Sequence, residues 1–314
     1  MSTSSTPSIP IFATSPERKR HARRGLLVYF ALLIPLSTVG YVFASITKSF
    51  SWTIALMCTP AISSVVARLA LREGFADVSF RLGGRRGLKA LLVALVLPAG
   101  IGLVAYGIGW ITALTPFTAP PSGFFRKLLP ADGAPPALLF LVSLLFTMTI
   151  GTLYSAPMTF GEELGWRGYM VTRLIDAGLP KPILLSGLIW GVWHVPLIVT
   201  GAYIQSPYLA ASIVFFMIGV IALSYILARL RVATGSIWPG VFLHASWNAV
   251  IQATFDHSVT GAQSTLWTGE SGILVCAVLV IIALVLSRWR WTMTRQLPTR
   301  GNSVHEELLP PALI

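Results

Sequence analysis

The chain has 314 residues, of which 54% are hydrophobic and 11% charged, and its mean hydropathy is +0.74. Soluble domains carry about 25% charged residues, so this composition excludes an ordinary soluble globular protein. The net charge of +12 does not indicate nucleic-acid binding, because the basic residues are distributed between the apolar runs, and we expect no nucleic-acid partner.

Long apolar runs follow one another along the whole chain. A helix of about 20 residues crosses the hydrocarbon layer, and by that length we predict about eight spans. Lipid cannot satisfy open backbone groups, so runs of this kind predict an all-α, polytopic membrane helix bundle. The expected spans are 25–46, 52–71, 88–113, 137–160, 183–201, 208–228, 237–255 and 271–287.

The remaining segments are short and polar. Residues 1–24 are rich in Ser, Thr and Pro and then basic, which predicts a disordered cytoplasmic tail. Residues 25–290 form one predicted membrane domain, and 291–314 a C-terminal tail. Polar loops are expected over 72–89 on the inner side and, with several prolines, over 114–136 on the outer side.

The basic residues predict the orientation of the bundle. With the N-terminus in the cytoplasm and eight spans, nearly all of the 23 Lys and Arg residues fall on the inner side. Only Lys48, Arg126 and Lys127 fall outside. This asymmetry follows the positive-inside rule and places both termini in the cytoplasm.

Three stretches carry polar side chains at places where lipid disfavours them. An ionisable residue within a membrane span is costly and indicates function. The first stretch, TFGEELGWRGY, follows the fourth span, and the other two, WGVWHVP and PGVFLHASWN, lie within the fifth and seventh. Their polar residues are Glu162, Glu163, Arg167, His194, His244 and Asn248.

The spacing within these stretches predicts which face of its helix each polar side chain occupies. Glu163 and Arg167 are four residues apart with the acid first, the favourable order for a helical ion pair, and Glu162 points about 100° away from Glu163. His244 and Asn248 are also four residues apart and share a face. We expect the carboxylates at the inner end of the fourth span, and the two histidines in the cytoplasmic half or at the midplane of theirs, so that the three stretches can converge.

A converging set of this kind suggests hydrolysis. A carboxylate in a low-dielectric site can act as a general base towards water, a histidine can assist it, and a His with an Asn can stabilise an oxyanion. A zinc site on Glu162, His194 and His244 stays open, although the chain has no H-E-x-x-H motif. Taken singly, the stretches also fit a helix-end charge cluster and satisfied interhelical polar residues.

The stretches EELGWRGY, SGLIWGVWHVP and GSIWPGVFLHASWNA resemble the three motifs of the CAAX-protease and bacteriocin-processing (CPBP, Abi-like) family, which includes the type II CAAX prenyl endopeptidases. The resemblance covers residues 137–255. It implies that Glu162, helped by His194, activates water, that Glu163 pairs with Arg167, and that His244 and Asn248 form the oxyanion hole. The prenyl endopeptidases usually carry Phe at the position of Trp190, which puts a prenylated substrate in question.

The expected function is therefore an intramembrane endopeptidase of the cell membrane, with its active site open to the cytoplasm. Its expected partners are membrane lipids and a peptide or protein substrate, membrane-anchored substrates included, and no obligatory cofactor is expected. One alternative is a non-catalytic membrane scaffold or bacteriocin-immunity-type protein of the same fold. A proton-coupled transporter is a second alternative, against which the sequence shows no repeated halves.

Overall fold

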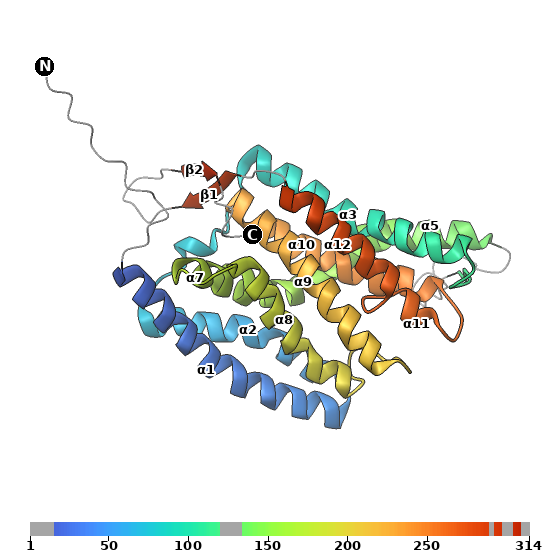
Figure 1. Ribbon diagram of the computed structural model, residues 1–314, viewed down its shortest axis with the longest axis horizontal. Helices are drawn as coiled ribbons and strands as arrows, with labels where there is room; N and C mark the ends of the chain where they lie inside the picture. Colours follow the sequence, from blue (N-terminus) through green and yellow to red (C-terminus); the bar gives the residue numbers. More distant parts are fainter. Residues whose placement is uncertain (1–15, 120–133, 289–291, 297–303, 309–314) are drawn as a thin grey trace, which may run out of the picture.

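The computed structural model describes residues 16–119, 134–288, 292–296 and 304–308, and almost all of these residues are helical (Figure 1). The first helices are long and are joined by short connections. They are α1 (Pro16–Thr47), α2 (Phe50–Leu71), the 3-10 turn η1 (Ala76–Val78) and α3 (Gly84–Ile111).

One continuous helix, Pro136–Asp176, carries the first polar stretch. Two π-helical segments interrupt its α-helical winding. In chain order its parts are α5 (Pro136–Phe146), η2 (Thr147–Gly151), α6 (Thr152–Gly165), η3 (Trp166–Met170) and α7 (Val171–Asp176).

The second half of the bundle begins with α8 (Pro182–Val199) and α9 (Leu209–Thr234). A further helix starts as α10 (Trp238–Trp247) and continues as the π-helical η4 (Asn248–Phe255) and the 3-10 turn η5 (Asp256–Ser258). The short α11 (Ser264–Trp267), α12 (Ile273–Arg288) and the strands β1 (Thr292–Gln296) and β2 (Val304–Leu308) follow.

Glycine and proline mark the helix boundaries. Pro182 stands in the first turn of α8, where its missing N–H costs no hydrogen bond. Gly235 ends α9 in a left-handed conformation, with φ of +64°, and its N–H reaches back to the carbonyl of Arg231. Pro239 then opens α10. These signals separate apolar runs that would otherwise merge, and so they fix where each helix turns back.

Six of the described helices are long and apolar enough to cross a membrane, which makes the chain a multi-pass membrane protein. All eight predicted runs coincide with helices. However, α12 has only 16 residues, and the helix formed by α10 and η4 is not among the six. The number of eight spans therefore stays a prediction. The six are Pro16–Thr47, Ser51–Leu71, Gly84–Ile111, Pro136–Asp176, Pro182–Val199 and Leu209–Thr234.

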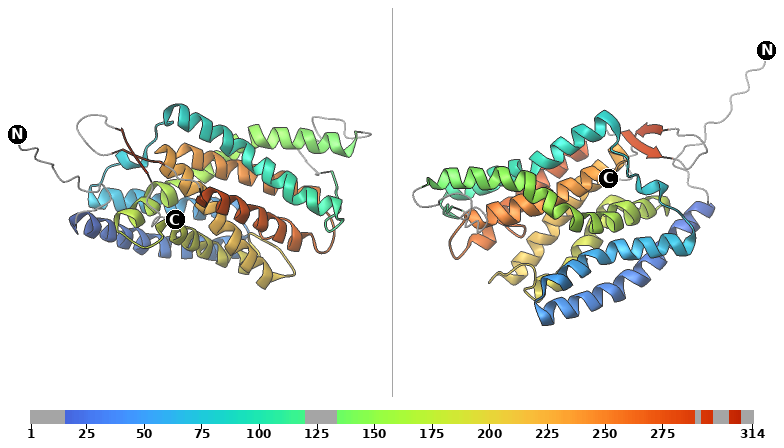
Figure 2. Two further views of the ribbon diagram at one scale, coloured as in Figure 1. Left: turned by 45° about the horizontal axis from the view of Figure 1, so that its top comes forward. Right: turned by 180° about the vertical axis from the view of Figure 1, so that it is seen from behind.

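The helices pack in pairs along the bundle. Helices α1 and α2 lie side by side at one edge, as both views of Figure 2 show, and α2 also packs against α6. Helix α9 contacts α8 on one flank and α12 on the other. Helix α10 lies between α3, α6 and α9, so that the second and third polar stretches face the first across the middle of the bundle.

Two predictions at the ends of the chain differ from the structure. Residues 16–24, predicted to belong to a disordered tail, form the first turns of α1, because Ala22 is buried and Arg18 Nη2 lies 3.2 Å from Asp176 Oδ2 of α7. Within the predicted C-terminal tail, β1 and β2 form an antiparallel pair with Thr292 opposite Leu308. Residues 1–15 lie outside the described part of the chain.

An ion cluster gathers charges at one end of the bundle. Arg173 binds Glu73 at 2.7 Å and Asp77 at 2.9 Å, and Arg68 binds Asp77 as well. Burial raises the pKa of Asp77, but the guanidinium groups of Arg173 and Arg68 outweigh this effect and hold that pKa below its usual value. The predicted inner loop therefore lies against α7, as the expected grouping of basic segments on one side requires.

Candidate functional site

The first polar stretch lies inside a helix. Glu162 and Glu163 were expected where the fourth span ends, near residue 160, but the helix continues to Asp176. Gly165 lets this helix approach α2 closely, since a Cβ there would lie 2.4 Å from the backbone carbonyl carbon of Pro60. Because of this continuation, the two carboxylates are buried among helices rather than placed at a helix end.

The predicted ion pair between Glu163 and Arg167 is present. Arg167 Nη1 donates to Glu163 Oε1 at 2.7 Å, and both side chains are buried. The same carboxylate oxygen accepts from His244 Nδ1 at 3.0 Å. The guanidinium carbon of Arg167 also lies 4.2 Å from the ring centre of Trp190, a cation–π distance. Glu163 therefore joins its own helix to α10, and Arg167 joins it to α8.

Glu162 points to different partners, as the helical rotation predicts. Its Oε2 accepts a hydrogen bond from Trp190 Nε1 at 3.1 Å, and its Oε1 lies 4.0 Å from His244 Nε2. Trp190, which the sequence singled out as the position where the prenyl endopeptidases usually carry Phe, is thus a direct partner of this carboxylate. The indole N–H can only donate, so it holds one carboxylate oxygen in place.

The hydrogen bonds of the two histidines fix their tautomers. His194 Nδ1 lies 2.9 Å from the carbonyl oxygen of Trp190, and a carbonyl only accepts, so Nδ1 carries the proton. In the neutral ring, His194 Nε2 is left as an acceptor. His244 Nδ1 likewise donates to Glu163, which leaves its Nε2 towards Glu162.

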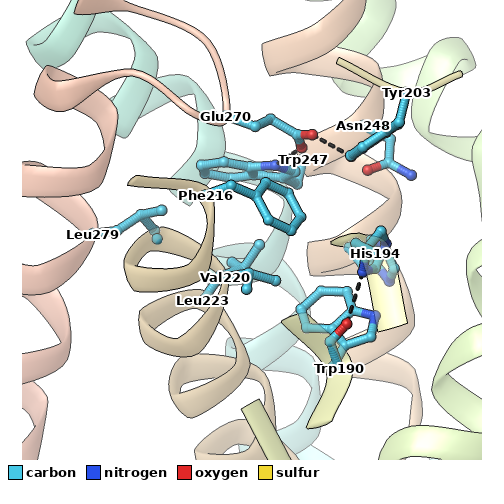
Figure 3. Close-up of a pocket in the computed structure, with 12 residues that line it drawn as sticks. Trp190, His194, Tyr203, Phe216, Val220, Leu223, Trp247, Asn248, Glu270 and Leu279 are labelled. Atoms are coloured by element: carbon cyan, nitrogen blue, oxygen red, sulfur yellow. Dashed lines mark hydrogen bonds between the residues drawn. The ribbon is translucent and has the colours of Figure 1, made fainter. Parts of the chain in front are cut away.

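A small cavity brings the second and third stretches together (Figure 3). Its volume of about 30 Å³ accommodates one or two water molecules. His194, His244 and Asn248 all line it, and Trp190 closes one end. Trp190 and His244 both line the cavity and contact Glu162, so they connect the carboxylates to this space. The apolar part of the wall comes from α9 and α12 and comprises Phe216, Val220, Leu223 and Leu279.

A zinc site on Glu162, His194 and His244 was left open by the sequence, and the structure does not group these three side chains as metal ligands. Among the described residues, no three His, Cys, Asp or Glu side chains are grouped so as to hold an ion. Glu162 and His244 approach each other, but His194 stands on the cavity side, bound to the Trp190 carbonyl. This donor set does not fit zinc, which needs three protein ligands at about 2.0–2.2 Å.

A second polar group at the cavity was not predicted from the sequence. Glu270 lines the cavity at the end opposite Trp190 and accepts hydrogen bonds from Tyr203 Oη and Trp247 Nε1 (Figure 3). Gln252 Nε2 also donates to Glu270 Oε1, at 3.1 Å. The available signal was weak: Glu270 is the one charged residue between Asp256 and Arg288.

A comparison with protein families finds a match over the middle of the chain. The family model of the Rce1-like type II CAAX prenyl endopeptidases matches residues 134–250, which include all six predicted site residues. Over these residues the chain is similar to the CAAX-protease family, which supports the resemblance of its three motifs. The match begins just before α5 and ends within η4, so it covers the helices that carry the three motifs and leaves out α1 to α3. No curated protein matches the chain.

Similarity to this protease family gives the buried cluster a chemical context. The CAAX-protease motifs are distributed here over α6 and η3, α8, and α10 and η4, and the folded bundle brings them into one site. The site combines a carboxylate, two histidines of defined tautomer and a side-chain amide. Glu162 contacts Trp190 and His244 of the cavity wall, and His194, His244 and Asn248 place hydrogen-bonding groups around the water-sized space itself.

Proposed function

We propose that the protein is an intramembrane endopeptidase that hydrolyses a peptide bond by direct attack of activated water. One observation carries this proposal: His194, His244 and Asn248 line one small cavity while His244 and Trp190 also contact the buried Glu162. A carboxylate base and oxyanion donors around a water-sized space are what such a reaction needs.

Each residue has a role in the proposed reaction. Glu162 takes the proton of the attacking water, and His194 accepts a hydrogen bond from this water through its bare Nε2. His244, in its doubly protonated form, donates through Nε2 to the oxyanion of the tetrahedral intermediate, and Asn248 donates through its NH₂ group. When the intermediate collapses, the C–N bond breaks and Glu162 passes its proton to the departing amine. Glu163, paired with Arg167, holds His244 through Nδ1 and stabilises its positive charge when the ring is protonated.

A comparison of protein termini tests the function directly. Membrane proteins from cells with the wild-type chain and from cells with Glu162→Ala are compared by mass spectrometry of their N- and C-terminal peptides. We expect termini that depend on the wild type and that lie in or near membrane-embedded segments of the substrates. Identical sets of termini would instead support the non-catalytic scaffold, which does not need Glu162.

We propose that the reaction needs no obligatory metal, on the basis of the donor geometry. We expect elemental analysis of the pure, active protein to find less than stoichiometric zinc and activity to survive a titration with a chelator. Stoichiometric zinc, with activity lost on its removal and restored on its return, would contradict this prediction.

We also propose that the site opens to the cytoplasm and that the ion cluster marks the cytoplasmic end. Arg85, exposed at the start of α3, then lies inside, and Ala262, exposed beyond η5, lies outside. In a chain with Cys58 and Cys276 replaced by alanine, Arg85→Cys should react with an impermeant thiol reagent only in inside-out vesicles. Ala262→Cys is the matched control and should react only in intact cells. The opposite pattern would invert the topology.

A further inference from the structure

The polar group around Glu270 lies at the far end of the cavity from Trp190. Glu270 belongs to the connection between α11 and α12, Tyr203 to the connection between α8 and α9, and Trp247 and Gln252 to the helix formed by α10 and η4. Its carboxylate receives three donors: the Tyr203 hydroxyl, the Trp247 indole and the Gln252 amide. Three separate segments therefore meet at one acidic side chain (Figure 3).

The hydrogen bonds of this group form a chain that ends at Asn248. Gln252 Nε2 lies 3.1 Å from Glu270 Oε1, 3.1 Å from Tyr203 Oη and 3.3 Å from Asn248 Oδ1. A side-chain amide can be turned by 180° with little change in shape, so its orientation is decided by its partners. Glu270 is the partner that decides it here.

The chemistry of the carboxylate sets the direction of the whole chain. An ionised carboxylate accepts hydrogen bonds and donates none, so Gln252 must present its NH₂ group to Glu270. The second hydrogen of this NH₂ group is shared between Tyr203 Oη and Asn248 Oδ1. Asn248 therefore turns its accepting oxygen, and not its own NH₂ group, towards Gln252. With Oδ1 engaged in this way, the NH₂ group of Asn248 remains to serve as a donor towards the cavity that Asn248 lines.

We infer that Glu270, acting through Gln252, is a positioning residue that orients the Asn248 amide as a hydrogen-bond donor for the oxyanion. The inference rests on the proposed function, because it assigns the direction of a donor that the proposed reaction uses. Without Glu270, Gln252 can turn its carbonyl oxygen towards Asn248. Asn248 then donates to Gln252 and presents its own oxygen to the cavity, where it repels an oxyanion.

The test compares peptide cleavage by the purified full-length chain and by Glu270→Gln. Loss of an oxyanion donor costs roughly 100- to 1,000-fold in kcat, and a partly reoriented amide should lower kcat by about tenfold with KM nearly unchanged. Gln252→Leu breaks the chain at its middle and should give a similar loss. This second variant keeps the test open if Glu270→Gln does not fold.

A double-mutant cycle separates positioning from a general structural effect. In an Asn248→Ala background there is no amide to orient, so adding Glu270→Gln should lower kcat by less than about twofold. Asp256→Asn is the matched control: Asp256 is an acidic residue at the same end of the bundle that binds Tyr106. Any loss of kcat that it causes should be equally large in both backgrounds.

The outcomes distinguish a failure of the positioning role from a failure of the proposed function. Cleavage by Glu270→Gln at the wild-type rate, or an equal further loss in the Asn248→Ala background, would overturn the positioning role and leave the proposed protease intact. If neither the wild type nor any variant cleaves peptides, the proposed function fails and the positioning role falls with it.

Discussion

Glu162→Gln should abolish peptide cleavage while leaving the fold intact. The amide oxygen can still accept the hydrogen bond of Trp190 Nε1, so the side chain keeps its place. The amide cannot take a proton from water, and loss of a general base costs about 100- to 10,000-fold in rate. We therefore expect kcat to fall by at least about 100-fold, measured on a peptide identified by the comparison of termini.

Glu17→Gln is the matched control, because Glu17 is exposed near the start of α1 and undergoes the same chemical change. It should cleave at the wild-type rate. The thermal unfolding of both variants in detergent should match that of the wild type, which excludes misfolding as the cause of the loss. Cleavage by Glu162→Gln within a few-fold of the wild-type rate would disprove the assignment of the base.

Arg167→Ala should be among the most destabilising single substitutions in the chain. It leaves the Glu163 carboxylate buried without its cationic partner, and breaking a buried ion pair from one side costs about 3–5 kcal/mol. Glu163→Ala should cost a similar amount, because it strands the buried guanidinium. The double variant should be little worse than either single variant, since both changes break one interaction. The measurement is the free energy of unfolding in detergent micelles.

Arg18→Ala is a matched control in the same helical assembly. Arg18 also pairs with an acid, Asp176, but its side chain is 37% exposed. Exposed pairs contribute about 0–1 kcal/mol, so this substitution should change the free energy of unfolding by no more than that. Strictly additive losses for Glu163→Ala and Arg167→Ala would show that the two residues do not support each other.

The helical architecture could be predicted because lipid leaves few choices. Apolar runs of about 20 residues must be helices in a bilayer, and all eight predicted runs are helical. The boundaries were harder to predict. The fourth helix runs on from residue 160 to Asp176, because the carboxylates that signalled its end, Glu162 and Glu163, accept hydrogen bonds from α8 and α10. Residues 16–24 are helical for a similar reason, since Arg18 pairs with Asp176 of α7.

Spacing along a helix predicted part of the site. The distance of four residues between Glu163 and Arg167 predicted their ion pair, and the rotation of Glu162 predicted its different partners. The bond between Glu163 and His244 joins residues 81 positions apart, and no local pattern indicates it. The place of Glu270 at the cavity was not predicted for the same reason, because its partners Tyr203 and Gln252 come from distant segments.

The π-helical segments relax the constraint on residue number in the helix that carries the carboxylates. A π turn holds one residue more than an α turn, so deleting one residue from Trp166–Met170 would restore regular winding and leave the residues that follow at nearly the same rotation relative to Glu163. Arg173 would then still face Glu73 and Asp77 of the ion cluster. Relatives that share both the carboxylate pair and this cluster should therefore differ by one residue only where a π turn is present in one of them and absent from the other.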